Sequence, residues 1–479
     1  MSTQTPINDK IAPKDLSLIA LFSLIFGSMM GSGVFDIPQN VGHAAGVIAV
    51  LISWGITTIG MLSLGWAFVY ITRCRPDIQS GIYGYARYGF GSYVGFNAAW
   101  GYWLSALLGN ASYLVYIFAS LGNFAVFKFL GQGNTFFALI SESVLIWIVY
   151  ILISRGIREA SLVNILITTV KFLALMVVVI LFIYGFHWSQ FKVNFTPELH
   201  LGSLMTQIKS TMLVTVWDFI GIEAACIYAL RARNMQDVAI ATTLGVIVVL
   251  VIDALISILP FGIISSSAIS KLMTPSTASV LVIISGNLSA ELVRLAVVIS
   301  VIGALLAWMM LATNVLYVAA EDRTLPKFLM QLNERNVPRN SLLTSSIILQ
   351  AFIIIAYFTQ SVYLAMIQLA TSLILVPYLL SALFAFKLFI TDKKVEFIIL
   401  LKGVLAVIYA IWLIYAGGLK YLAFASILYL AGMLFYVMAR LEEKEPVFTS
   451  IFEKAIFTIL IILAILSVYF WLRGNLSLY

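Results

Sequence analysis

Apolar runs recur along the sequence from residue 15 to residue 472, and each reaches the roughly 20 residues that a helix needs to cross a bilayer. Charged residues make up only 10% of the chain, whereas a soluble domain carries about 25%. No stretch is long and polar enough to form a separate soluble domain. The sequence therefore predicts an all-α polytopic membrane protein.

The hydropathy pattern predicts about thirteen transmembrane helices. An amphipathic segment at 77–91 separates the second from the third span, and the longest polar connection, 321–340, contains Pro326 and Pro338, which argue against one continuous helix. The predicted spans are 15–42, 45–71, 91–127, 136–154, 158–186, 206–230, 238–264, 288–320, 341–358, 362–388, 396–416, 420–439 and 455–472.

The placement of basic residues predicts the orientation. With residues 1–14 as a cytoplasmic tail, most Lys and Arg side chains fall in cytoplasmic loops, as the positive-inside rule requires. The tail lacks the apolar core and cleavage site of a signal peptide, so the first helix is expected to be retained. The net charge of +7 therefore reflects membrane orientation and contact with anionic lipid, and no nucleic-acid partner is expected.

The residues that enzymes, metal sites and channels need do not form recognisable patterns. Cys74 and Cys226 are far apart, and the three histidines are scattered, so we expect no disulfide, no metal site and no cofactor. The sequence contains no HExxH or GxSxG motif and no filter repeat of a channel. These features favour a transporter over an enzyme.

Two spans carry glycine and polar groups in mid-membrane, where a continuous helix would carry Leu or Ile. The first contains Gly27–Gly33 and the sixth contains Trp217–Glu223. Interrupted helices at matching positions of two halves indicate an inverted-repeat transporter with its site at the midplane. Taken alone, each motif could also be explained by glycines that only allow close packing between helices.

Broken helices offer groups that suit an α-amino acid. The N–H groups at Ser32 and Gly33, at the start of a half-helix, attract an anion such as an α-carboxylate. Carbonyl groups freed at the two breaks are acceptors that suit an α-ammonium. Glycine leaves room for a ligand to touch the backbone.

Five motifs give the chain a family resemblance. Gly31–Phe35, Gly81–Arg87 and Phe219–Glu223 resemble the amino acid–polyamine–organocation superfamily. Ile37–Asn40 and Ala99–Trp103 resemble its basic amino acid/polyamine antiporters, and the likeness is greatest to arginine/ornithine antiporters. The resemblance covers nearly the whole chain.

This resemblance implies a 5+5 inverted-repeat helix bundle with discontinuous helices 1 and 6. The transport core would cover 15–390, with repeats at about 15–186 and 206–390, and residues 391–479 would form peripheral helices. The chain would exchange cationic amino acids across the bacterial cytoplasmic (inner) membrane, as a monomer or homodimer among membrane lipids.

The resemblance also implies the roles of individual residues. In the substrate site, the α-carboxylate would be bound by Ser32 and Gly33. The α-ammonium would be bound by the carbonyl groups of Met29, Trp217 and Ile220. The distal cationic group would be bound by Asn110 and Trp308. Tyr102, Glu223 and Tyr378 would form a gate on one side. Without the resemblance, Trp308 and the two tyrosines would be interpreted as packing residues.

Charged residues inside the spans are costly and therefore informative. Asp218 stands where the family usually has a small or apolar residue, and we expect it to add negative charge to the substrate site. Glu142 and Asp36 could instead lie at solvated helix ends without a functional role. Asp253 has no predicted role. Lys171 matches a lysine that replaces a sodium ion in proton-coupled and sodium-independent relatives.

The predicted function is exchange of arginine for ornithine or a related amine by alternating access. Two alternatives share the same site. One is proton-coupled amino acid uptake, with Glu223 or Lys171 as the titrating group. The other is an exchanger of another amino acid and its decarboxylation product.

Overall fold

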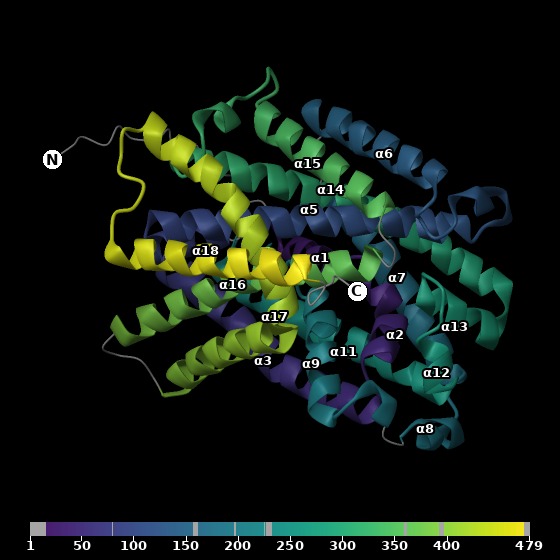
Figure 1. Cartoon of the computed structure of the whole chain (residues 1–479). Helices are drawn as coiled ribbons and strands as arrows, with labels where there is room; N and C mark the ends of the chain where they lie inside the picture. The colour runs from purple at the N-terminus through teal and green to yellow at the C-terminus, as the bar shows by residue number, and fades with distance from the viewer. Residues whose placement is uncertain are drawn as a thin grey trace.

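A computed structural model describes residues 16–78, 80–156, 161–195, 198–224, 226, 232–358, 362–391 and 397–473. Within these ranges the regular structure is helical, and β-pairing is limited to two isolated bridges. The helices form one bundle (Figure 1). This arrangement satisfies backbone hydrogen bonds inside each helix, as the bilayer interior requires.

Twelve spans in the described residues are long and apolar enough to cross a membrane. They agree with twelve of the thirteen predicted spans to within a few residues. They are α1 with α2 (Leu18–Met29, Gly33–Ala44), α3 (Val47–Cys74), α5 (Ser92–Gly122), α6 (Phe136–Ser154), α7 (Ser161–Tyr184), α11 with η4 (Met235–Ile258, Leu259–Gly262), α14 (Asn287–Glu321), α15 (Arg339–Tyr357), α16 (Val362–Thr391), two halves of α17 (Phe397–Glu442) and α18 (Ile451–Leu472).

The predicted sixth span differs from the others because it is interrupted. Its first helical part is α9, Leu204–Trp217, turns follow from Asp218 to Glu223, and the backbone is helical again at Ala224. Residue 225 and residues 227–231 lie outside the described ranges, as does the tail at 1–14. The eleventh and twelfth spans join in α17, where Gly418 adopts a φ of 78° and separates the two halves.

Shorter helices connect the spans. The amphipathic segment forms α4, Gly81–Phe90, and the polar connection holds only a short 3-10 helix, η5 (Lys327–Met330), as its prolines predict. The remaining short helices in the described residues are η1 (Ala125–Leu130), α8 (Trp188–Asn194), η2 (Leu199–Leu201), α12 (Ser266–Ile269) and α13 (Ser276–Ser285).

The bundle is organised around α5. This helix crosses the middle of the molecule in Figure 1 and packs against α4, α14 and α16. In the most apolar 18-residue stretch of α5, 94% of the residues are buried, whereas only 11% are buried in the corresponding stretch of α18. The polar groups along α5 are therefore inside the protein, and α18 presents its apolar side chains outward.

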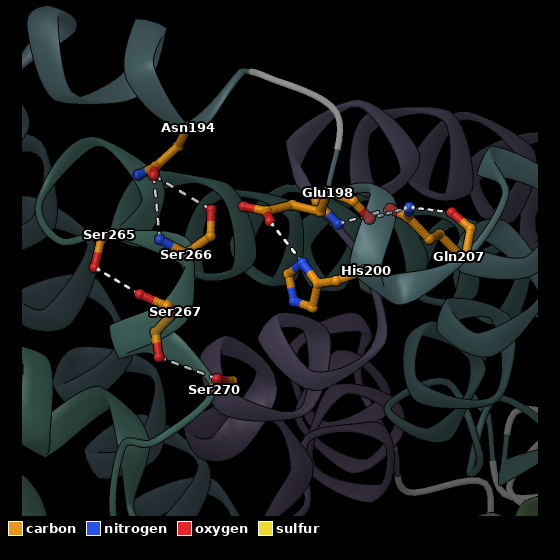
Figure 2. A network of polar contacts seen from close by, with 10 residues as sticks. Asn194, Glu198, His200, Gln207, Ser265, Ser266, Ser267 and Ser270 are labelled. Carbon is orange, nitrogen blue, oxygen red and sulfur yellow. Dashed lines mark hydrogen bonds and ion pairs between the residues drawn. The ribbon is translucent and has the colours of Figure 1, made fainter.

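Figure 2 shows two groups of polar contacts, one that joins the end of α8 to α12 and one that joins the connection around η2 to the first turn of α9. The Asn194 amide oxygen accepts from the backbone and side chain of Ser266 at 3.1 and 3.2 Å. Gln207 donates to the carbonyls of Glu198 and Gly202 and accepts from the N–H of Gly46. These contacts link α8 to α12, and they link the start of α9 to Gly46 just before α3.

Candidate functional site

The first and sixth predicted spans are broken where the glycine motifs indicated. Residues 30–32 are not helical between α1 and α2, and α9 gives way to turns after Trp217. Helix ends leave backbone N–H and C=O groups without partners inside the helix. The prediction that helices 1 and 6 are discontinuous is confirmed.

The two breaks contact each other. A Cβ atom added to Gly33 would lie 2.1 Å from Oδ1 of Asp218. One added to Gly221, whose φ is +115°, would lie 2.7 Å from the backbone carbonyl atoms of Ser28. The Ser28 hydroxyl donates to the carbonyl oxygen of Gly221 at 3.0 Å. Glycine at position 221 therefore lets the two backbones touch, and glycine at position 33 leaves room for the side chains of Asp218 and Trp217.

A small cavity lies beside the breaks. Trp217, Ile220 and Trp308 line it together with Ser105, Ala106, Gly109 and Tyr113. Its free volume is about 10 Å³, which is room for about one water molecule. The indole N–H of Trp308 donates to the carbonyl of Ser28 at 3.3 Å. The predicted tryptophan thus contacts the broken end of α1 directly.

Other predicted substrate residues are buried nearby but already have contacts. The Ser32 hydroxyl lies 3.1 Å from the Tyr363 hydroxyl. The carbonyls of Met29 and Trp217 accept backbone N–H groups at 3.0 and 3.2 Å, and each oxygen keeps a second lone pair. Met29, Ser32 and Gly33 do not line the small cavity, so binding there requires the site to open.

Asn110 lies on α5 and is fully buried. Its amide nitrogen is 3.9 Å from the sulfur of Met309, and its amide oxygen has no hydrogen-bond partner among the described residues. It does not line the small cavity. Its predicted contact with the distal cationic group therefore stays a prediction.

The three predicted gate residues come together. The hydroxyl groups of Tyr102 and Tyr378 donate to the two carboxylate oxygens of Glu223 at 2.8 and 2.7 Å. The N–H of Gly221 donates to the same carboxylate at 3.0 Å. Three donors from α5, α16 and the break satisfy a carboxylate that would be costly alone. This cluster links the break to two neighbouring helices.

Lys171 lies on α7 and is 2% exposed. Its ammonium donates to the carbonyls of Gly27, at 3.3 Å, and Met30. These carbonyls belong to the end of α1, where the helix dipole is negative and attracts a cation. The lysine supplies both positive charge and hydrogen-bond donors to the break.

This geometry predicts sodium-independent transport, because the Lys171 ammonium occupies the position in which a cation would meet the α1 carbonyls. Uptake into proteoliposomes is expected to be the same when external sodium is replaced by choline at equal ionic strength. A steep rise of uptake with sodium concentration would contradict this role of Lys171.

The buried acids differ in what surrounds them. Asp36 is fully buried and accepts from Thr274 and from the N–H of Ser276 at the start of α13, so the solvated-end alternative is wrong for it. Glu142 is 3% exposed, so it is not a solvated end either. Asp218 and Asp253 are buried. The Asp218 carboxylate faces the backbone N–H of Val34 at the start of α2, whereas neither carboxylate oxygen of Asp253 has a hydrogen-bond partner among the described residues.

Sequence reasoning missed Tyr113 and Tyr363. Tyr113 lines the small cavity and contacts Trp217 edge to face, with 6.4 Å between ring centroids. It follows Tyr102 and Gly109 at helical spacing on α5, which is a signal that could have found it. Tyr363 stands at the start of α16 without such a signal, and only the fold brings it to Ser32.

Comparisons with known proteins identify the family of the chain. The amino acid permease family model matches residues 16–473. The arginine/ornithine antiporter of Pseudomonas aeruginosa is 40% identical over 97% of this chain and 98% of its own length. An arginine/agmatine antiporter of Chlamydia felis is 37% identical, covering 97% of this chain and 98% of the relative, and the L-lysine transport protein of Corynebacterium glutamicum is 36% identical, covering 97% of each.

These relatives are transporters, and the likeness runs from end to end. The helical bundle and the paired breaks in the first and sixth spans are the features that the sequence motifs implied. The chain belongs to the amino acid permease family of the amino acid–polyamine–organocation superfamily.

Proposed function

We propose that this protein exchanges cationic amino acids, arginine for ornithine or a related amine, by alternating access. The observation that carries the proposal is the contact between the two glycine-bearing breaks beside Trp308. The names of the three relatives support it, because each specifies arginine, ornithine, agmatine or lysine.

In the proposed complex, the α-carboxylate accepts from the backbone at Ser32 and Gly33, and the α-ammonium meets the carbonyls of Met29, Trp217 and Ile220. The ring of Trp308 attracts the guanidinium or side-chain ammonium, a contact worth about 0.5–2 kcal/mol. Trp308 must give up its bond to Ser28, and Tyr363 must leave Ser32, before the substrate enters.

In this proposal, two contacts close the site toward the two faces of the membrane. One is the contact between Tyr363 and Ser32, and the other is the Tyr102–Glu223–Tyr378 cluster, and these hydrogen bonds support it. Alternating access would open these closures in turn. Exchange requires in addition that the empty carrier reorients slowly, so that only loaded states cross.

The proposed location is the bacterial cytoplasmic membrane, with the N-terminus inside. The surplus of Lys and Arg in the loops on the N-terminal side supports this orientation. A homodimer is the proposed assembly, on the family resemblance alone. Light scattering of the purified protein in detergent would decide between dimer and monomer.

Counterflow in proteoliposomes tests the function. Liposomes loaded with ornithine should take up labelled arginine, and liposomes loaded with a neutral amino acid or buffer should not. Uptake into empty liposomes driven by a pH gradient would instead establish proton-coupled uptake. Absence of arginine uptake under every loading condition would contradict a cationic cargo.

Asp218 offers a test of charge selection. It is 1% exposed and lies against Gly33, beside the backbone N–H of Val34. In Asp218→Ser, the preference for arginine over neutral amino acids should fall by roughly tenfold, about the 1.4 kcal/mol lost with one charge interaction. The exposed Asp77→Ser should keep the wild-type ranking, and an unchanged ranking in Asp218→Ser would refute the role.

A further inference from the structure

A second, larger cavity lies on the other side of the contact between Ser32 and Tyr363. Its volume is about 440 Å³, within the range of roughly 300–1,000 Å³ that is usual for small-molecule sites. We call it the vestibule. Its lining comes from α2, α5, α6, α15, the start of α16 and the connections near residues 132–135 and 274.

The vestibule leads from the protein surface toward the breaks. His43, Gln132 and Asn134 on its lining are exposed, whereas Tyr116 is fully buried. The rings of Tyr116 and Tyr363 lie 5.2 Å apart between centroids, and the Tyr363 hydroxyl meets Ser32. The two tyrosines therefore separate the vestibule from the proposed substrate site.

Glu142 is the one carboxylate on the described lining. It is 3% exposed, and its Oε1 has no hydrogen-bond partner among the described residues. No Lys or Arg of the described chain lines the vestibule, and His43 is its other group able to carry charge near neutral pH. A buried carboxylate oxygen without a partner is unfavourable, and the vestibule beside Glu142 offers space for a group that could pair with it.

The rest of the lining suits an amino acid with a cationic side chain. Tyr116, Tyr357 and Tyr363 contribute aromatic rings, whose faces attract cations. Gln39 and Asn40 contribute side-chain amides, which can donate to a carboxylate. One end of the ligand would thus find a carboxylate and aromatic rings, and the other would find amide donors.

We propose that the vestibule is a second substrate site, in which Glu142 binds the side-chain cation of an amino acid before Tyr363 leaves Ser32. The inference rests on the proposed function, because it takes the same cationic amino acids as ligand. It adds a binding step on one face of the membrane and gives Glu142 a role apart from the breaks.

The test is binding of arginine to purified protein by isothermal titration, with four forms compared. Wild type should bind arginine at two sites. Glu142→Gln should weaken one of them by at least about tenfold and keep the other. Trp308→Ala should lose the site that Glu142→Gln keeps. The control Glu291→Gln removes an equal charge from an exposed position on α14 outside the vestibule lining and should match wild type.

The outcomes separate this inference from the proposed function. Absence of arginine binding to wild type would contradict both. A single site that is lost in Trp308→Ala and unchanged in Glu142→Gln would overturn the vestibule site alone. Thermal melting of each variant identifies a folding defect, and in that case Glu142→Asp, which keeps the charge, should retain both sites while Glu142→Gln retains one.

Discussion

Replacing Gly221 with alanine is expected to lower transport by at least roughly 100-fold, equivalent to about 2.7 kcal/mol. The new Cβ would lie 2.7 Å from the carbonyl carbon and oxygen of Ser28, which are backbone atoms that cannot rotate away. A φ of +115° is also strained for any residue with a side chain. Both effects separate the two breaks, and counterflow of labelled arginine measures the loss.

Gly55→Ala is the matched control. Gly55 lies within α3, and a Cβ there would meet no atom within 4 Å. Because alanine favours a helix more than glycine does, transport and melting temperature should equal or exceed those of wild type. If Gly221→Ala also transported normally, the two breaks would not need to touch for function.

Lys171→Met should abolish measurable exchange and lower stability. The substitution keeps an unbranched side chain but removes the donors for the carbonyls of Gly27 and Met30. Each buried acceptor left without a partner costs about 1–3 kcal/mol, and the broken end of α1 also loses its counter-charge. Melting temperature in detergent and counterflow in liposomes would both report the change.

Lys192→Met provides the comparison for that variant. Lys192 is exposed on α8, so the same substitution should leave stability and exchange near wild type. Exchange at the wild-type rate by Lys171→Met would show that the ammonium is dispensable at the break. A lower melting temperature with normal exchange would assign Lys171 a structural role only.

The positions of the spans were predictable because each membrane helix is marked by the apolar composition of its own residues. Twelve predicted spans appear in the described structure, and α4 follows the amphipathic pattern that marked it. The sixth span was located as well, and its helix α9 gives way to turns after Trp217. The join of two spans at Gly418 could not be predicted, since glycine there is compatible with a loop as well as a kink.

The breaks were predictable because glycine and polar residues in mid-membrane have few explanations. The meeting of Tyr102, Glu223 and Tyr378 followed from the family resemblance, since residues on three different elements share no local pattern. The partners of Asp36 and the approach of Tyr363 to Ser32 depend on the packing of distant segments. Residue-by-residue reading of one sequence does not contain that information.

A cryo-EM structure of the protein with bound arginine tests the central claim most directly. We predict that the α-carboxylate lies within about 3.2 Å of the backbone N–H groups or hydroxyl at Ser32 and Gly33, with the guanidinium facing Trp308. Arginine bound away from both breaks, or continuous helices through Gly31–Gly33 and Phe219–Ile222, would contradict the claim.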